Sequence, residues 1–105
     1  MRSMPIMDWS AYRSCGTPPQ LVQADYCDAA VMRRDRALRL RDVLGLEPKD
    51  DWNGGFLVDI DDFIDKAGQA LRGCRLRGED AVDMRLILID ADYAKRNGAT
   101  LFGAC

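Results

Sequence analysis

Two short acidic motifs carry the residue types and spacing in this chain that could hold a divalent cation. Asp59 and Asp61 follow one apolar run, and Asp90 and Asp92 follow a similar one. Carboxylates two residues apart can share Mg²⁺, and a bound Mg²⁺ can drive phosphoryl chemistry. The same residues also suit helix caps and solvated helix faces. This second interpretation is favoured, so no metal ligand and no cofactor is predicted, and a Mg²⁺-dependent enzyme is the weakest alternative.

The chain has no histidine. Its absence excludes Ser–His and Cys–His nucleophile pairs, the commonest zinc sites and the usual general base near neutral pH. The four cysteines (Cys15, Cys27, Cys74 and Cys105) show no C-x-x-C spacing and are predicted to remain reduced thiols. None has an evident activating base in the sequence. No catalytic residue is therefore predicted, and the chain is predicted not to be an enzyme.

An arginine-rich stretch between residues 33 and 41 is the main candidate for binding. It contains Arg33, Arg34, Arg36, Arg39 and Arg41. Aspartates interleave with these arginines, and Asp35 has the i, i+4 spacing that favours an ion pair with Arg39. No aromatic side chain lies within the stretch to stack on a base. Binding of nucleic acid through Arg33–Arg41 is therefore kept only as an alternative.

The position of two of these arginines is unusual if the surrounding segment is one helix. The apolar stripe of that helix contains Val22, Tyr26, Ala29, Leu40 and Leu44, and the same spacing places Arg33 and Arg36 within it. Their aliphatic stems could lie on the core, or the guanidinium groups could pair with the aspartates of residues 59–65. A third interpretation is adopted as the hypothesis: Arg33 and Arg36, with Arg34 and Arg39, contact a partner protein.

Capping signals predict a long helix over residues 18–44. Thr17 and Gln20 form a capping box, and Pro18 suits the first helical position. Gly45 can adopt the left-handed conformation that ends a helix, and Pro48 prevents continuation. Upstream, residues 8–13 are predicted to form a short helical turn that packs Trp9 and Tyr12 on the core.

Two further helices are predicted, over residues 59–72 and 80–97. The first has apolar residues at helical spacing and ends at Gly73. The second carries two apolar stripes, one of Val82, Leu86, Ile89 and Tyr93 and the other of Met84, Ile87, Ala91 and Ala94. A helix that is apolar on two faces requires cover on two sides. The sequence therefore predicts a central helix with Leu86, Ile89 and Tyr93 largely buried.

The predicted fold is mainly α, a small helical bundle that forms one domain over residues 1–105. An α/β fold is the alternative, because short apolar runs fit a buried strand as well as a helix. In that alternative, strands occupy residues 56–60 and 85–89.

The function predicted by exclusion is that of a small protein-binding module: an inhibitor, adaptor or regulator. Composition is that of an ordinary globular protein, with 48% hydrophobic and 30% charged residues. No signal peptide and no membrane span is predicted, so a cytoplasmic location is expected. Toxin-immunity proteins and phage proteins that block host defences share this general profile, which is an analogy of type. The sequence names neither the partner nor the oligomeric state.

Overall fold

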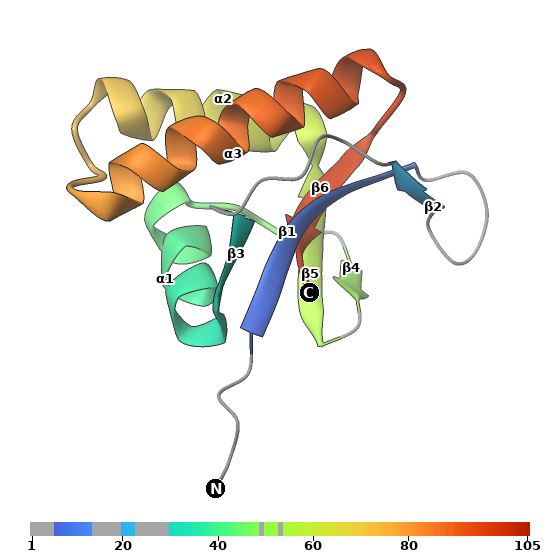
Figure 1. The fold of residues 1–105 in the computed structure, drawn as a ribbon, viewed down its shortest axis with the longest axis horizontal. Helices are drawn as coiled ribbons and strands as arrows, with labels where there is room; N and C mark the ends of the chain where they lie inside the picture. Colours follow the sequence, from blue (N-terminus) through green and yellow to red (C-terminus); the bar gives the residue numbers. More distant parts are fainter. Residues whose placement is uncertain (1–5, 14–19, 23–29, 49, 53) are drawn as a thin grey trace, which may run out of the picture.

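The computed structural model describes residues 6–13, 20–22, 30–48, 50–52 and 54–105. The strands are β1 (Ile6–Arg13), β2 (Gln20–Val22), β3 (Val31–Arg33), β4 (Asp50–Trp52), β5 (Gly55–Asp59) and β6 (Leu101–Ala104). The helices are α1 (Arg34–Leu44), α2 (Ile60–Arg72) and α3 (Glu79–Arg96). All three helices contribute to one core against a single face of an antiparallel sheet (Figure 1). The protein is therefore an α/β fold, and the prediction of a mainly α helical bundle is wrong.

The sheet has the strand order β2-β1-β6-β5-β4, with antiparallel pairing throughout. Strand β3 also pairs with β1, along residues 6–8, whereas β2 pairs with residues 11–13. The two short strands therefore share one edge of β1. Strand β6 lies between β1 and β5, with Phe102 opposite both Ala11 and Val58. Strand β6 is therefore the middle strand of this order, and it pairs directly with β1, the first strand of the chain.

Strand β1 forms where a short helical turn was predicted, and that prediction is wrong. Its apolar residues alternate, so Met7, Trp9 and Ala11 are buried in the core shared with the helices. This period of two is the pattern of a strand with one buried face. Trp9 and Tyr12 are both buried, as predicted, although on opposite faces of the sheet.

Strand β5 contains three consecutive buried residues. Phe56 and Val58 face the helices, whereas Leu57 packs with Tyr12 and Leu101 on the other face. A short apolar run of this kind is consistent with a strand covered on both faces. The alternative prediction of a strand at residues 56–60 is therefore nearly correct, although α2 already begins at Ile60. Its second strand, residues 85–89, is wrong because those residues lie within α3.

The predicted long helix over residues 18–44 is also wrong, since β2 and β3 occupy part of that range and α1 begins only at Arg34. Pairing of Met32 with Met7 places residues 31–33 in the sheet. The predicted end is correct: Gly45 has φ 71°, and the Leu46 N–H donates to the Arg41 carbonyl at 3.1 Å. The predicted capping box at Thr17 lies outside the described residues.

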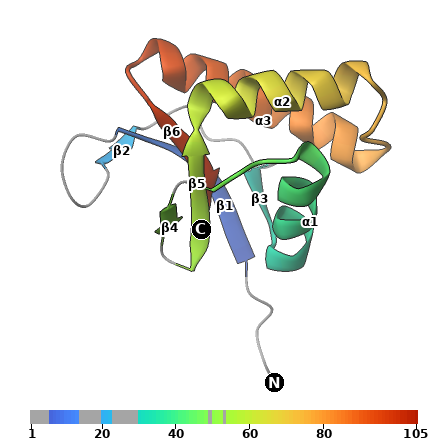
Figure 2. The same cartoon turned by 180° about the vertical axis from the view of Figure 1, so that it is seen from behind.

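Helices α2 and α3 lie within one residue of the predicted ranges 59–72 and 80–97. They run side by side across the sheet, as the view from behind shows (Figure 2). Beneath them, the Trp9 ring has its centroid 5.3 Å from that of Phe56, 5.6 Å from Phe63 and 6.0 Å from Phe102. Phe63 comes from α2 and the others from the sheet, so aromatic packing joins the two layers.

Candidate functional site

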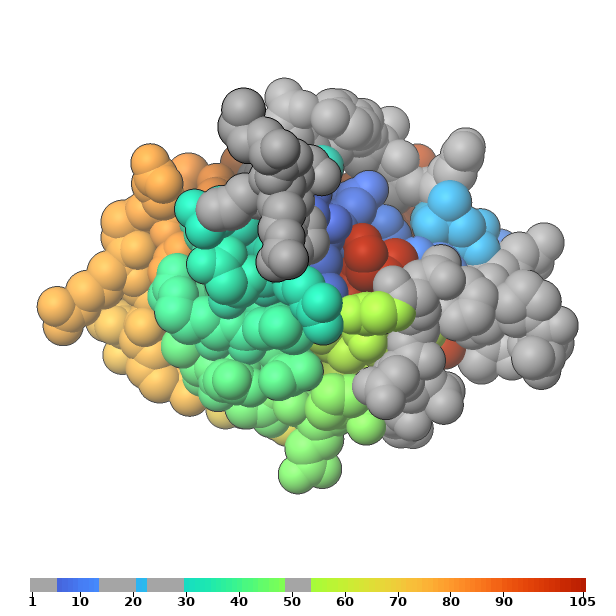
Figure 3. Space-filling view, turned by 90° about the horizontal axis from the view of Figure 1, so that it is seen from below, coloured from blue at the N-terminus to red at the C-terminus, as the bar shows by residue number. Residues whose placement is uncertain are grey.

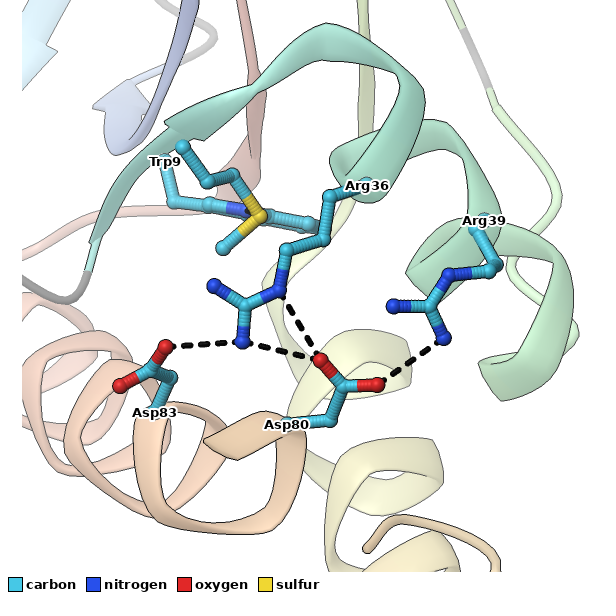
Figure 4. A network of polar contacts seen from close by, with 6 residues as sticks. Trp9, Arg36, Arg39, Asp80 and Asp83 are labelled. Atoms are coloured by element: carbon cyan, nitrogen blue, oxygen red, sulfur yellow. Dashed lines mark hydrogen bonds and ion pairs between the residues drawn. The ribbon is translucent and has the colours of Figure 1, made fainter. Parts of the chain in front are cut away.

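The structure brings together two of the four arginines that were predicted to bind a partner. Arg33 and Arg34 are exposed at the end of β3 and the start of α1, and Arg33 Nε lies 3.4 Å from Asp35 Oδ1. Arg36 and Arg39 point from α1 toward the first turns of α3 (Figure 4). The acidic residues between positions 59 and 65, considered as partners for Arg36, are not the ones it contacts in the described structure.

We call the α1–α3 ion-pair cluster the four residues Arg36, Arg39, Asp80 and Asp83. Arg36 Nε donates to Asp80 Oδ1 at 2.9 Å, and Arg36 Nη2 donates to Asp83 Oδ2 at 2.8 Å. Arg39 Nη1 donates to the other oxygen of Asp80 at 2.9 Å. Both carboxylate oxygens of Asp80 therefore accept from an arginine of α1, and Figure 4 shows the guanidinium groups approaching from that helix.

The α1–α3 ion-pair cluster is partly buried. The side chains of Arg36 and Asp80 are only 24% and 18% exposed. Burial alone opposes ionisation of Asp80, but hydrogen bonds and positive charge from Arg39 and Arg36 outweigh it, and the pKa of Asp80 is lowered. Burial likewise opposes the charge on Arg36, whereas the hydrogen bonds from Asp83 and Asp80 raise its pKa. Both groups are therefore charged at neutral pH.

The cluster fixes the N-terminal end of α3 against α1. Figure 3 shows α1 next to the segment that joins α2 to α3. Asp80 lies in the first turn of α3, where a negative charge is also stabilised by the helix dipole. Because aspartates neutralise Arg36 and Arg39, the cluster gives little support to nucleic-acid binding. A partner contact through Arg33, Arg34, Arg36 and Arg39 stays a prediction.

The two Asp-x-Asp motifs do not form a metal centre in the described part of the chain. Asp59 ends β5, while Asp61 lies in the first turn of α2 and contacts Lys95 of α3. Asp92 lies on α3 with its Oδ2 3.3 Å from Arg96 Nη2. Within the described residues, no three or more acidic, cysteine or histidine side chains gather where they could hold a metal ion.

Of the four thiols, Cys74 and Cys105 lie in the described ranges, and both are free. Cys74 is exposed directly after α2, whereas Cys105 Sγ lies 3.3 Å from the hydroxyl oxygen of Tyr12. Cys15 and Cys27 lie outside those ranges. No nucleophile is assigned to either described thiol.

An apolar stripe on α3 is the most distinctive surface feature of the described structure. We call the outer face of α3 the stripe Val82, Leu86, Ile89 and Tyr93, whose residues are 54%, 46%, 66% and 43% exposed. The prediction that Leu86, Ile89 and Tyr93 are largely buried is therefore wrong. The second stripe, Met84, Ile87, Ala91 and Ala94, is the one that packs in the core. The other large exposed apolar residues of the described chain (Ile6, Leu21 and Val31) belong to strands.

Charged residues flank the outer face. Arg85 and Asp92, seven residues apart, lie along one edge, and both are exposed. Asp83 and Asp90 lie along the other edge, where Asp83 is already bonded to Arg36. The stripe is visible in the sequence, but its spacing was interpreted only as a sign of core packing, so none of its residues was predicted to bind a partner.

None of the helices in the described ranges is both long enough and apolar enough to cross a membrane. Scans against protein-family models, curated proteins and solved structures each found no match.

Proposed function

We propose that this chain is a non-enzymatic protein-binding module that binds a partner through the outer face of α3. The observation that supports the proposal is the exposure of Val82, Leu86, Ile89 and Tyr93 on one side of a single helix. Contiguous exposed apolar side chains rimmed by charge are typical of interaction sites. Spacing of i, i+4, i+7 and i+11 is also the pattern with which one helix face engages a groove or another helix.

Energetics favour the same interpretation. Fully burying a large aliphatic or aromatic side chain is worth roughly 1.5–3 kcal/mol. These four residues leave much of that free energy unused in the single chain, because each remains at least 43% exposed. Only part of it would appear as affinity, since association costs translational and rotational freedom. Four adjacent anchors are nevertheless sufficient to form the centre of a binding site.

The arginines predicted to contact a partner lie outside the outer face of α3, on β3 and α1. Arg33 and Arg34 are exposed and available to a partner, whereas Arg36 and Arg39 would have to leave or share Asp80. Inhibitor, adaptor and regulator all remain compatible with such a module, and a cytoplasmic location is part of the proposal.

Site-specific photo-crosslinking in an extract of the native host tests the proposal. A photoreactive residue replaces Tyr93, and a second version carries it at Gln69, an exposed position on α2. We expect an adduct of defined mass from position 93 but not from position 69. Ile89→Lys should abolish the adduct, because it places a charge at the centre of the apolar stripe.

The control substitution is Gln69→Lys, which adds the same charge away from the stripe and should leave the adduct intact. Folding of every variant is checked by circular dichroism and thermal unfolding. Equal labelling from positions 69 and 93, or an adduct that persists with Ile89→Lys, would refute the outer face as the binding site.

A further inference from the structure

We infer that the partner of the outer face is a second copy of this chain, joined through an antiparallel α3–α3 pair about a two-fold axis. This inference rests on the proposed function, because it uses the same surface and names its occupant. A two-fold interface requires a surface that is complementary to itself. The apolar residues of the outer face meet this requirement, and so do Arg85 and Asp92, the charged residues along one of its edges.

The apolar residues have the spacing of a helix pair. Successive steps from Val82 to Leu86, Ile89 and Tyr93 are four, three and four residues, which is the alternation of a and d positions in a heptad. The midpoint of the stripe lies between Ile87 and Leu88, which is also the midpoint of α3. In an antiparallel pair centred there, Leu86 of one copy meets Ile89 of the other.

The outer pair of residues follows the same symmetry. Val82 of one copy meets Tyr93 of the second, and the two-fold axis repeats both contacts. Each of these contacts therefore pairs a large side chain with a smaller or similar one. Tyr93 of one copy does not face Tyr93 of the other. The apolar contact extends over roughly 16 Å of helix at 1.5 Å per residue.

Charge gives an independent argument for the second copy. Arg85 and Asp92 occupy the same edge of the stripe, on opposite sides of its midpoint. An antiparallel arrangement brings equivalent edges together, so Arg85 of each copy meets Asp92 of the other, twice in one interface. In the single chain, Asp92 contacts Arg96 at 3.3 Å with both side chains largely exposed. That surface pair is weak enough to be shared.

The opposite edge contains two acids, Asp83 and Asp90, and it would be repulsive if both brought an unbalanced charge. The α1–α3 ion-pair cluster removes this obstacle. Arg36 Nη2 lies 2.8 Å from Asp83 Oδ2, so a guanidinium accompanies that carboxylate at the interface edge. The cluster inside each copy thereby makes the edge compatible with a second copy.

Sedimentation equilibrium of the purified chain, with a reductant present, tests this inference. A contact of two heptads is short for a stable interface, so we expect a dimer whose population rises with protein concentration. Ile89→Lys should produce a monomer across the same range, and Gln69→Lys should dimerise like the unmodified chain. A chain that stays monomeric up to its solubility limit, or an Ile89→Lys variant that still dimerises, overturns the inference.

A charge-swap experiment tests the antiparallel orientation. Arg85→Asp and Asp92→Arg each place like charges opposite one another twice, so each variant alone should self-associate at least about tenfold more weakly. Mixed together, the two variants have opposite charges at both contacts and should form a heterodimer. Failure of the mixture to recover association excludes the proposed orientation.

The two proposals can fail separately. A monomeric purified chain whose position 93 still crosslinks a different protein in host extract would refute the second copy but preserve the proposed function. A monomeric chain without any such adduct would refute both. A dimer that resists Ile89→Lys would show that the copies associate through another surface.

Discussion

The inner and outer faces of α3 differ less in hydrophobicity than in the size of their side chains. The inner face presents Met84, Ile87, Ala91 and Ala94, all fully buried, and half of these residues are alanines. The outer face presents one valine, one leucine, one isoleucine and one tyrosine, all exposed. Small residues let α3 lie close to α2 and β1, with which it makes its main contacts. The stripe with the larger side chains is therefore the one that the fold leaves exposed.

This comparison shows that an apolar stripe identifies a surface to be covered without identifying what covers it. Burial of a stripe within one chain and burial between chains depend on the same transfer of apolar area from water. Spacing along α3 is equally regular on both faces, so periodicity alone cannot separate them. The ion-pair cluster at Asp80 helps to decide, because it fixes the rotation of α3 about its own axis.

The two faces should differ most in the free energy of unfolding that is lost when an isoleucine on each face is replaced by alanine. Ile87→Ala removes a fully buried side chain and should lower the free energy of unfolding by about 2–5 kcal/mol. Ile89→Ala, at a residue that is 66% exposed, should change it by less than about 1 kcal/mol. Urea unfolding at a protein concentration that keeps the chain monomeric measures both. Equal losses at the two positions would mean that the outer face is covered within the single chain.

A smaller loss of stability is expected from a substitution in the α1–α3 ion-pair cluster. Asp80→Asn should cost about 1–3 kcal/mol, because it weakens charged hydrogen bonds to both Arg36 and Arg39. The pKa of Asp80 is lowered in the folded chain, so its stabilisation is complete above the unfolded value of about 3.9. It is lost progressively as the pH falls from there through the lowered folded value.

Measuring the free energy of unfolding between neutral and acidic pH tests whether this stabilisation is lost as the pH falls. The Asp80→Asn variant should lose less stability on acidification than the unmodified chain does. Asp42→Asn is the matched control, because the Asp42 side chain is 72% exposed beside Arg41. A variant at position 80 with unchanged stability and unchanged acid sensitivity would contradict the proposed role of the cluster.

The smallest effect is expected for Val82→Ala on the outer face. Alanine has a higher helix propensity than valine, and Val82 is 54% exposed, so little packing is lost. The free energy of unfolding of the monomer should stay within about 0.5 kcal/mol of its original value. Self-association should weaken, since Val82 faces Tyr93 of the second copy. A clear loss of monomer stability with unchanged association would reverse the assignment of this face.

Local signals were sufficient for parts of the fold. The end of α1 was predictable because Gly45 and Pro48 act through backbone conformation alone. Helices α2 and α3 were predictable from helical spacing over many residues. Strand β1 was not recognised, although the alternation of Met7, Trp9 and Ala11 was present in the sequence. Its hydrogen-bond partners lie on β2, β3 and β6, so no local signal could establish the pairing.

The candidate sites, like the fold, were predictable from the sequence only in part. The arginine-rich stretch was recognisable, but the carboxylates that bind Arg36 and Arg39 lie more than forty positions along the chain. Helical spacing gave two apolar stripes on α3, and tertiary contacts with α1, α2 and the sheet selected Met84 and Ile87 for the core.

By itself, the sequence determined where α2 and α3 lie, where α1 ends, and that no histidine chemistry is available, because these depend on residue identity and short-range geometry. Only the tertiary structure decided that residues 6–13 and 101–104 are neighbouring strands, and that Leu86 and Ile89 face outward. Both depend on contacts between segments distant in the chain, whose free energy no local window contains.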